Sequence, residues 1–243
     1  DGSKQKHGET FWETYAPVAS WPVIRLLLIL IITRKWHTRQ IDYVMAYTQA
    51  EAETDLLYMK IPRGFTIEGG EPNEYVLKIL RNIYGQKQAG RVWNTHLVGK
   101  LQEIGFKQSA IMECVFYRGK SIYVLYTDDS ILAGPDQHEL DQIIADIKAA
   151  GLNITVEGDV SDFLGVNIKR NDDGTVSLTQ PKLIAQILED LRLSNGNVNT
   201  KAIPAASTVL LRRHLEAEPF DGHFDYRSVI SKLNYLEKST RPD

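Results

Sequence analysis

Three aspartates, Asp42, Asp128 and Asp129, are the residues whose type and spacing best suggest chemistry. The adjacent pair follows an apolar run that ends at Tyr126, and Asp42 lies in a β-like run that begins at Arg39. If the two runs are neighbouring strands, the three carboxylates converge on one edge of a sheet, with no cation next to them in the chain. Unpaired carboxylates repel one another, so such a cluster persists mainly where divalent cations lie between them.

Magnesium suits such a cluster, because it takes oxygen ligands and usually binds one or two carboxylates together with substrate phosphates. Two such ions roughly 4 Å apart activate an attacking hydroxyl and stabilise the leaving oxygen of an in-line phosphoryl transfer. The pattern therefore predicts a nucleotidyl transferase. An isolated Tyr-x-Asp-Asp sequence is more often a solvated turn, since Asp is a favoured turn residue, and the residues alone leave that alternative open.

The elements that must position these aspartates are short strands mixed with helices. Helical spacing and end signals predict helices over 21–35, 86–104, 135–150 and from the cap Thr179 onward. Apolar alternation and turn residues predict strands over 39–46, 56–61, 114–117, 121–126, 131–134, 163–169 and 175–178. One hairpin turns at the acidic pair and another at 171–174. This order favours an α+β fold with an antiparallel sheet over a doubly wound one.

The composition of the 243-residue chain, 43% hydrophobic and 24% charged, is that of a globular protein and excludes disorder and collagen-like repeats. The most apolar stretch, 24–32, contains Arg25 and falls far short of the roughly 20 residues that span a bilayer. The single cysteine, Cys114, cannot form an intrachain disulfide. A net charge of −3 argues against a surface that is basic all over, so a polyanion must meet a local patch.

Such a patch is a stretch without Asp or Glu from Tyr75 to Gln102. Five basic residues fall inside it, with Tyr84 and Trp93 interleaved: Lys78, Arg81, Lys87, Arg91 and Lys100. Basic side chains neutralise phosphates and flat rings stack on bases, so the stretch suits a nucleic-acid or nucleotide surface. A helix with a solvated basic face explains the same pattern.

Five ordered blocks resemble copia-type retrotransposon reverse transcriptases. They are 40–47 (Gln-Ile-Asp-Tyr-Val-Met-Ala-Tyr), 57–65, 83–93, 126–129 (Tyr-Thr-Asp-Asp) and 163–166 (Phe-Leu-Gly-Val), with further similarity at 14–18, 226–228 and 240–243. The similarity covers nearly the whole chain, and its ordered blocks outweigh the solvated-turn alternative. It implies an RNA-directed DNA polymerase of a retrotransposon Pol polyprotein, with a palm-and-fingers fold, an antiparallel palm sheet and a partial thumb.

The resemblance also implies a domain organisation. A reverse transcriptase domain spans 1–215, and a connecting segment toward an RNase H region spans 216–243. Within the domain, the implied subdivisions are fingers over about 1–40 and 48–90, palm over about 41–47 and 91–178, and the start of a thumb over about 179–215. The absence of an initiator Met and the end at Asp243 lead us to expect one catalytic lobe of a longer polyprotein.

By resemblance, Asp42, Asp128 and Asp129 are the catalytic residues. Together with the backbone carbonyl of Tyr43 they are the implied ligands of two Mg²⁺ ions, which Mn²⁺ can replace. Tyr47 matches the aromatic position under the incoming sugar, where a ring clashes with a 2′-hydroxyl and selects deoxynucleotides. A core tyrosine at a strand end is the alternative for Tyr47.

Further site residues follow from the same blocks. The implied substrate-binding residues are Tyr43, Tyr47, Tyr84, Gly85, Lys87 and Arg25, and the implied nucleic-acid-binding residues are Arg91, Trp93, Phe163, Leu164 and Gly165. The last three resemble a hairpin that grips the primer terminus. Arg25 equally suits an ion pair that anchors its helix. Three departures stand out: Thr127 replaces the usual Val, Gly90 replaces a common Pro, and no lysine between 151 and 162 offers a general acid.

The implied partners are an RNA or DNA template with its primer, deoxynucleoside triphosphates, and the RNase H and integrase modules of the same polyprotein, with no membrane. The implied location is the cytoplasm, in virus-like particles. The main alternative is a truncated or degenerate element remnant that binds nucleic acid without polymerising. A cyclase with a similar palm is a weaker alternative, because the sequence blocks outside the aspartate motifs do not support it.

Overall fold

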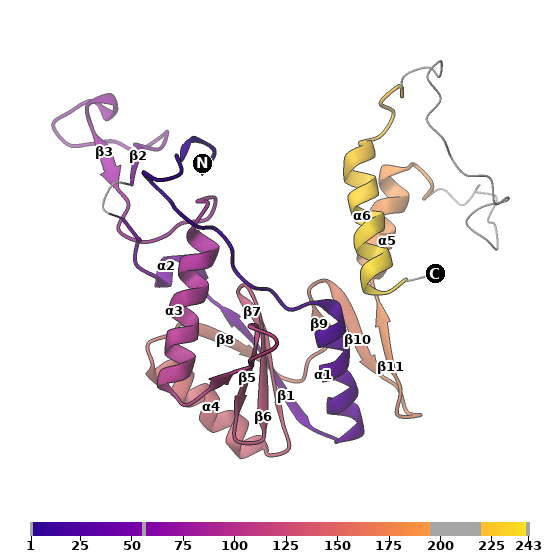
Figure 1. Cartoon of the computed structure of the whole chain (residues 1–243). Helices are drawn as coiled ribbons and strands as arrows, with labels where there is room; N and C mark the ends of the chain where they lie inside the picture. The colour runs from indigo at the N-terminus through magenta and orange to yellow at the C-terminus, as the bar shows by residue number, and fades with distance from the viewer. Residues whose placement is uncertain (1, 55–56, 195–219, 242–243) are drawn as a thin grey trace. The chain divides into compact units, whose positions relative to one another are not determined.

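The computed structural model describes residues 2–54, 57–194 and 220–241 (Figure 1). The chain divides into two compact units, Asp1–Val160 and Ser161–Asp243. Every strand pairing in the three sheets is antiparallel, which confirms the predicted antiparallel α+β class. Within the described part of the chain, no helix is both long and apolar enough to cross a membrane.

The first unit is built on a six-stranded sheet with the order β4-β5-β6-β7-β1-β8. Its strands are β1 (His37–Tyr43), β4 (Lys107–Gln108), β5 (Val115–Arg118), β6 (Ser121–Tyr126), β7 (Asp129–Gly134) and β8 (Ile154–Glu157). The hairpin predicted at the acidic pair is confirmed as β6–β7. The earlier strand β1 inserts between β7 and β8, and so lies beside the acidic turn.

Two helices cover one face of this sheet. They are α3 (Ala89–Glu103), which ends before Gly105 with its left-handed φ of 91°, and α4 (Gln137–Ala149). Both bring apolar side chains to a core shared with β1, β6 and β7, in which Trp93, Leu97 and Ile143 are fully buried. Amphipathic spacing in the sequence predicted both helices, because the buried stripe repeats every three or four residues.

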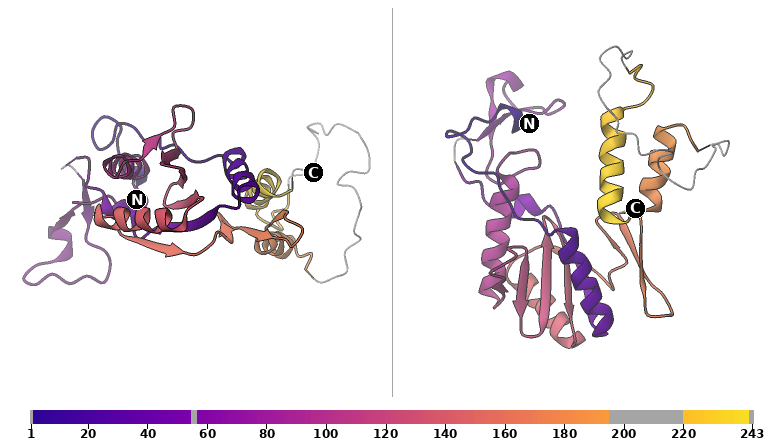
Figure 2. Two further views of the ribbon diagram at one scale, coloured as in Figure 1. Left: turned by 90° about the horizontal axis from the view of Figure 1, so that it is seen from below. Right: turned by 45° about the vertical axis from the view of Figure 1, so that its right-hand side comes forward.

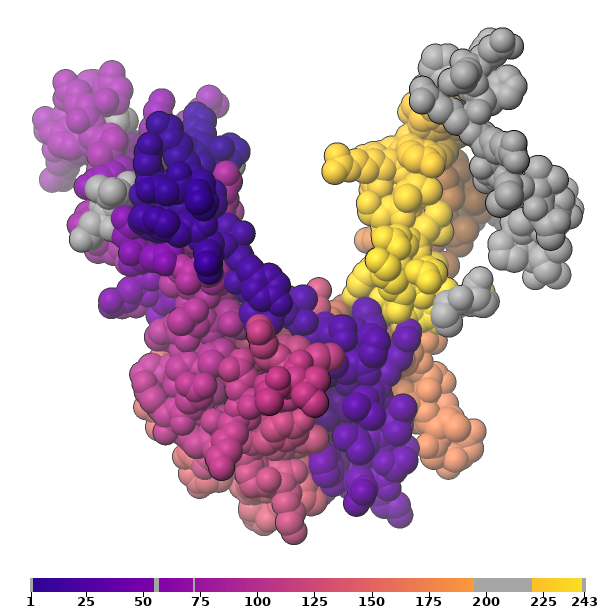
Figure 3. Space-filling view, viewed as in Figure 1, coloured from indigo at the N-terminus to yellow at the C-terminus, as the bar shows by residue number. Residues whose placement is uncertain are grey.

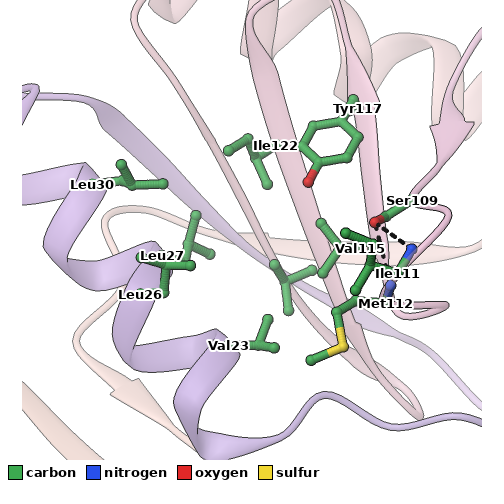
Figure 4. A pocket seen from close by; sticks show the side chains of 11 residues that line it. Val23, Leu26, Leu27, Leu30, Ser109, Ile111, Met112, Val115, Tyr117 and Ile122 are labelled. Atoms are coloured by element: carbon green, nitrogen blue, oxygen red, sulfur yellow. Dashed lines mark hydrogen bonds between the residues drawn. The ribbon is translucent and has the colours of Figure 1, made fainter.

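Helix α1 (Trp21–Thr33) covers the other face. Ile122 and Val124 of β6, which alternate with the core residues Tyr123 and Leu125 and so point the opposite way, line a pocket together with α1 (Figure 4). The pocket measures about 190 Å³ and its lining is mostly apolar. None of the three aspartates lines it.

Smaller elements surround the sheet. They are η1 (Gly2–Lys4), the one-turn helix α2 (Ala46–Gln49), β2 (Tyr58–Lys60), η2 (Pro72–Glu74) and β3 (Val76–Lys78). Strands β2 and β3 form a separate two-stranded sheet. In Figures 1 and 3 the N-terminal segment, in indigo, runs over the surface of the first unit from the neighbourhood of β2 and β3 to α1. The strand predicted over 56–61 is observed from Tyr58, and residues 55–56 lie outside the described residues.

The second unit combines a three-stranded sheet with two helices that run side by side (Figure 2). Its elements are β9 (Asp162–Phe163), β10 (Val166–Arg170), β11 (Val176–Thr179), α5 (Pro181–Asp190) and α6 (Tyr226–Ser239). The Nζ atom of Lys232 lies 2.6 Å from an Oδ atom of Asp190, so an ion pair links α6 to α5. Residues 195–215 of the predicted thumb lie outside the described residues.

Two local predictions in the second unit were wrong. The strand predicted over 163–169 is split, because Leu164 and Gly165 have left-handed φ values of 54° and 71° and reverse the chain between β9 and β10. The helix cap is Gln180 rather than Thr179, which is instead the last residue of β11. The hairpin prediction at 171–174 is confirmed by the pairing of β10 with β11.

Candidate active site

Asp42 and Asp129 face each other across two central strands of the six-stranded sheet. They are Cα partners in the antiparallel β1–β7 pair, one position along from the Ile41–Ser130 pair. Directly opposed residues of an antiparallel pair point to the same face, with Cβ atoms about 5 Å apart. The two carboxylates therefore lie side by side, on the sheet face opposite to the buried side chains of Ile41 and Tyr43.

Asp128 joins this pair from the turn between β6 and β7. The turn consists of Thr127 and Asp128, because Tyr126 and Asp129 are the last paired residues of the hairpin. Thr127 has a left-handed φ of 56°, a conformation that is rare for a β-branched residue. The backbone carbonyl of Asp128 accepts a hydrogen bond from the N–H of Tyr43 at 3.1 Å, which ties the turn to the end of β1.

The electrostatics of the cluster are dominated by burial and mutual repulsion. Burial raises the pKa of Asp129 to about 6, and the negative charges of Asp128, Asp42 and Glu157 add to the increase. Burial also raises the pKa of Asp128, against a backbone hydrogen bond that lowers it, and Asp42 adds to the increase. Burial and mutual repulsion both disfavour the charged form of the carboxylates, whereas a bound cation would favour it.

No cation of the described residues is paired with the cluster. Among residues 2–54, 57–194 and 220–241, none of the ion pairs includes any of the three aspartates. The Oδ2 atom of Asp42 accepts a hydrogen bond from the hydroxyl of Thr155 on β8 at 3.2 Å. Oxygen-only donors with an uncompensated negative charge suit a hard divalent cation.

The carboxylates do not enclose a metal site by themselves. In the described ranges, no three His, Cys, Asp or Glu side chains are arranged closely enough to hold an ion. Magnesium typically binds through one or two protein carboxylates, with waters and substrate phosphates as its other ligands. The donor chemistry therefore fits a metal that binds together with a nucleotide, and the predicted four-ligand set remains a prediction.

The structure brings Tyr47 and Tyr84 to the same place as the aspartates. Their ring centroids are 4.5 Å apart, with the planes tilted by 46°. Burial raises the pKa of both hydroxyls, and the charge of Asp128 adds to each increase, joined by that of Asp42 for Tyr84. Tyr47 lies on α2, which follows Met45 in a left-handed conformation with φ of 51°. This bend carries the Tyr47 ring from the end of β1 back toward the carboxylates.

The N-terminal segment holds the loop that carries Gly85 and Lys87. The carbonyl of Gly85 accepts a hydrogen bond from the N–H of Gly2 at 2.8 Å. The backbone N–H of Lys87 donates to the side-chain oxygen of Gln5 at 2.8 Å, and its Nζ atom donates to the Gln5 carbonyl at 3.3 Å. The same ammonium lies 4.7 Å from the centre of the Phe11 ring, so Lys87 is held by protein contacts in this structure.

Arg91, predicted to bind nucleic acid, and Arg25, predicted to bind substrate, lie in different surroundings. Arg91 forms an ion pair with Glu53 and donates from Nε to the carbonyl of Glu13 at 3.1 Å. Its guanidinium thus links α3 to two surface segments. Arg25 is partly exposed on α1. The predicted contacts of Arg91 with nucleic acid and of Arg25 with substrate remain predictions.

The predicted role of Trp93 was wrong. The sequence predicted that its ring contacts nucleic acid, but the side chain is fully buried and packs edge-on against Tyr43 at a centroid distance of 5.1 Å. A buried ring cannot stack on a base. Its indole N–H donates to the carbonyl of Thr127 at 2.8 Å, so Trp93 supports the acidic turn from inside the core.

The residues predicted to grip a primer belong to the second unit. Leu164 and Gly165 form the two-residue turn between β9 and β10, and Phe163 before them is buried. The carbonyl of Leu164 accepts a hydrogen bond from the hydroxyl of Tyr235 on α6 at 2.6 Å. The turn is therefore anchored by a helix, and its contact with a primer remains a prediction. The predicted contact of the Phe163 side chain was wrong, because this ring is fully buried.

The comparison with known protein families agrees with this arrangement. A profile of the family described as "Reverse transcriptase (RNA-dependent DNA polymerase)" matches residues 1–207. The chain belongs to this family.

Relatives place this reverse transcriptase domain among the copia-type elements. The retrovirus-related Pol polyproteins from transposons RE1 and RE2 of Arabidopsis thaliana are 33% and 32% identical to the chain, over 247 and 250 aligned residues. The corresponding polyprotein from transposon TNT 1-94 of Nicotiana tabacum is 26% identical over 253 residues. Each match covers 100% of the chain but only 16%, 16% and 19% of the relative, respectively.

Sequence reasoning missed two residues of the candidate site. Thr155 contacts Asp42, and the charge of Glu157 acts on Asp129. Both lie on β8, which pairs with β1 and was not predicted. The β-branched run from Ile154 to Val156 is the signal that points to this strand.

Proposed function

We propose that the domain is an RNA-directed DNA polymerase that acts by two-metal nucleotidyl transfer in retrotransposon replication. The observation that carries the proposal is the pairing of Asp42 with Asp129 across β1 and β7, with Asp128 in the adjoining turn. The three carboxylates, which pair with no cation of the described residues, repel each other at one end of two central strands unless divalent cations and a nucleotide join them. Family membership supports the same activity.

The metal ligands would be Asp42, Asp128 and Asp129, with the backbone carbonyl of Tyr43 as an additional oxygen. When bound, two Mg²⁺ or Mn²⁺ ions would activate the primer 3′-hydroxyl and neutralise the charge that develops on the leaving pyrophosphate. The raised pKa values of Asp128 and Asp129 support this role, since a cation that favours the charged carboxylates relieves the repulsion between them.

The remaining site residues would bind and orient substrates. The Tyr47 ring, backed by Tyr84 at 4.5 Å, would lie under the sugar of the incoming nucleotide and exclude a 2′-hydroxyl. Gly85, Lys87 and Arg25 would contact the nucleotide. A positively charged ammonium such as that of Lys87 suits a triphosphate, provided that its contacts with Gln5 and Phe11 rearrange when the nucleotide binds.

In this proposal the subdivisions correspond to polymerase fingers, palm and thumb. The fingers comprise about 1–40 and 48–90, the palm about 41–47 and 91–178, and the thumb begins at about 179. The segment 216–243 would connect the domain to an RNase H region, and its helix α6 contacts α5 at the start of the thumb. Template and primer are the proposed ligands of Arg91 and of the turn at Leu164.

The chain spans less than a fifth of the length of the Pol polyproteins it resembles. RNase H and integrase modules of the same polyprotein would work with it, on an RNA or DNA template with deoxynucleoside triphosphates. Virus-like particles in the cytoplasm are the proposed location.

Primer extension tests the proposal. The purified chain is given a DNA primer on an RNA template, deoxynucleoside triphosphates and Mg²⁺, and extension is compared between the wild type, Asp128→Asn and Glu103→Gln. Glu103 is an exposed acid on α3 that pairs with Lys100, so its amide variant controls for the loss of one charge. We expect extension by the wild type and Glu103→Gln, and a loss of at least about 100-fold in Asp128→Asn.

The remnant alternative predicts a different result. A chain that shifts the template–primer in a gel but extends no primer with either Mg²⁺ or Mn²⁺ would overturn the polymerase proposal. Near-normal extension by Asp128→Asn would overturn the assignment of the acidic turn.

A further inference from the structure

Three buried hydroxyl groups lie beneath the candidate active site, on the core face of the sheet. Tyr43 on β1, Tyr123 on β6 and Ser130 on β7 are at most 1% exposed. Their surroundings are apolar, since Phe106, Phe116 and other core side chains pack around them. Phe and Ala would fill the same space without polar atoms, so the three hydroxyls call for an explanation other than packing.

The hydroxyls form a directional chain of hydrogen bonds. Tyr123 donates to Ser130 Oγ at 2.7 Å, and Ser130 donates to the backbone carbonyl of Ile41 at 3.2 Å. The Tyr43 and Tyr123 hydroxyl oxygens are 2.6 Å apart. Because Tyr123 has one proton and donates it to Ser130, Tyr43 must be the donor in this contact. All three protons are used, so no donor is left unsatisfied.

The chain of hydrogen bonds begins and ends on the same strand, β1. It leaves β1 at the side chain of Tyr43, crosses β6 and β7, and returns to β1 at the carbonyl of Ile41. These two residues flank Asp42, and Ser130 follows Asp129. The Ile41–Ser130 and Asp42–Asp129 pairs are consecutive in the β1–β7 register.

We propose that Tyr43, Tyr123 and Ser130 are positioning residues that hold Asp42 against Asp129 in the geometry that a divalent metal requires. This inference rests on the proposed polymerase function. Apolar contacts are non-directional, whereas a satisfied buried hydrogen-bond chain favours one arrangement of the strands that it joins. The two opposed carboxylates repel each other at the end of the β1–β7 ladder, where the hydrogen-bond chain ties the two strands together on the other face of the sheet.

The variants Tyr43→Phe, Tyr123→Phe and Ser130→Ala remove different parts of the chain. Tyr43→Phe removes one bond and leaves no donor unpaired. Ser130→Ala removes the link to β1 and leaves the Tyr123 donor without its acceptor, and Tyr123→Phe removes two bonds. We expect the Mg²⁺ concentration for half-maximal primer extension to rise by about 10-fold in Tyr123→Phe and Ser130→Ala. Tyr43→Phe should give a smaller increase, and the KM for the nucleotide should change less than the Mg²⁺ requirement.

Two control variants separate positioning from loss of stability. Tyr117→Phe removes a hydroxyl from β5 that lies outside the chain, and Ile147→Val trims a buried residue of α4. Both should keep the Mg²⁺ requirement of the wild type, even if Ile147→Val lowers the melting temperature as much as Tyr123→Phe. An equal rise of the Mg²⁺ requirement in Ile147→Val would overturn the proposal.

A second measurement needs no metal and no activity. Amide hydrogen exchange of the metal-free protein should be faster in β1 and β7 of Tyr123→Phe than of Tyr117→Phe, while α4 exchanges at the same rate in both. Unchanged exchange and an unchanged Mg²⁺ requirement would refute the positioning role while leaving the polymerase proposal standing. A wild type that extends no primer, but shows the expected exchange pattern, would refute the polymerase proposal instead.

Discussion

The indole N–H of Trp93 donates a hydrogen bond to the carbonyl oxygen of Thr127 at 2.8 Å. Thr127 is the first residue of the acidic turn and has a left-handed φ of 56°. Such a conformation costs about 1 to 2 kcal/mol in a residue other than glycine. The hydrogen bond from α3 therefore offsets strain at the point where the chain presents Asp128.

Removing this donor should loosen the acidic turn. Trp93→Phe keeps a buried aromatic ring but loses the N–H, which leaves the Thr127 carbonyl without its partner. We expect a loss of about 1 to 3 kcal/mol in the free energy of unfolding and a decrease of about 10-fold in kcat for primer extension. Urea unfolding and steady-state extension measure the two effects. Trp12→Phe, at an exposed position, should resemble the wild type, and a wild-type kcat in Trp93→Phe would contradict the role of the bond.

Sugar selection should depend on the Tyr47 ring rather than on its hydroxyl. In Tyr47→Ala we expect ribonucleotide incorporation, relative to deoxynucleotide incorporation, to increase by at least about 10-fold, because the steric block is removed. Tyr47→Phe should keep the selectivity of the wild type. Single-nucleotide incorporation assays give the ratio, and Tyr58→Ala, an exposed tyrosine on β2, is the control. Unchanged selectivity in Tyr47→Ala would show that the Tyr47 ring does not select the sugar.

The metal-free protein should lose stability as the pH rises. The folded-state pKa of Asp129 is raised to about 6, above its ordinary value of 3.8. The folded protein therefore holds this proton more tightly than the unfolded chain, so the added stability is full below pH 3.8 and is lost as the pH rises through about 6. Because the side chain is only half-buried, we expect a loss of about 1 kcal/mol between pH 4 and pH 7.

Urea unfolding in EDTA at several pH values measures this loss. Asp129→Asn should flatten the pH dependence over this range, whereas Glu103→Gln should not. Addition of Mg²⁺ together with a nucleotide at pH 7 should stabilise the wild type, since the bound cation favours the charged carboxylates. An equal pH dependence in Asp129→Asn and the wild type would show that this carboxyl does not titrate as described.

Gly85 should tolerate no side chain, for conformational rather than steric reasons. Its φ is 91°, although a Cβ atom at this position would meet nothing within 4 Å. Gly85→Ala should therefore destabilise the protein by about 1 to 2 kcal/mol and raise the KM for the nucleotide, as the Tyr84–Lys87 loop shifts. Gly99→Ala is the matched control, because Gly99 lies in α3 with equal space and a helical backbone. It should stabilise the helix by up to about 1 kcal/mol, and a stable Gly85→Ala with an unchanged KM would contradict the prediction.

Much of the first unit could be predicted, because short stretches of sequence specify most of its helices and strands. Repeats of three and four residues identified α3 and α4, an apolar stretch of helical length identified α1, and turn residues identified the β6–β7 hairpin. The strand β8 was not predicted, because its only sequence signal is the β-branched run from Ile154 to Val156, which is too short to show an alternating pattern. The turn at Leu164, which separates β9 from β10, was not predicted either, because leucine rarely adopts a left-handed φ and gives no sequence signal for it comparable to that of glycine.

The sequence by itself determined the chemistry available to this protein: three aspartates without adjacent cations, a tyrosine five residues after the first of them, and ordered blocks shared with copia-type reverse transcriptases. Only the tertiary structure decided how these residues meet. It paired Ile41 with Ser130 across 89 residues of chain, which sets Asp42 against Asp129. It also buried Trp93, because an indole that both packs against Tyr43 and bonds Thr127 is more stable inside the core than on the surface.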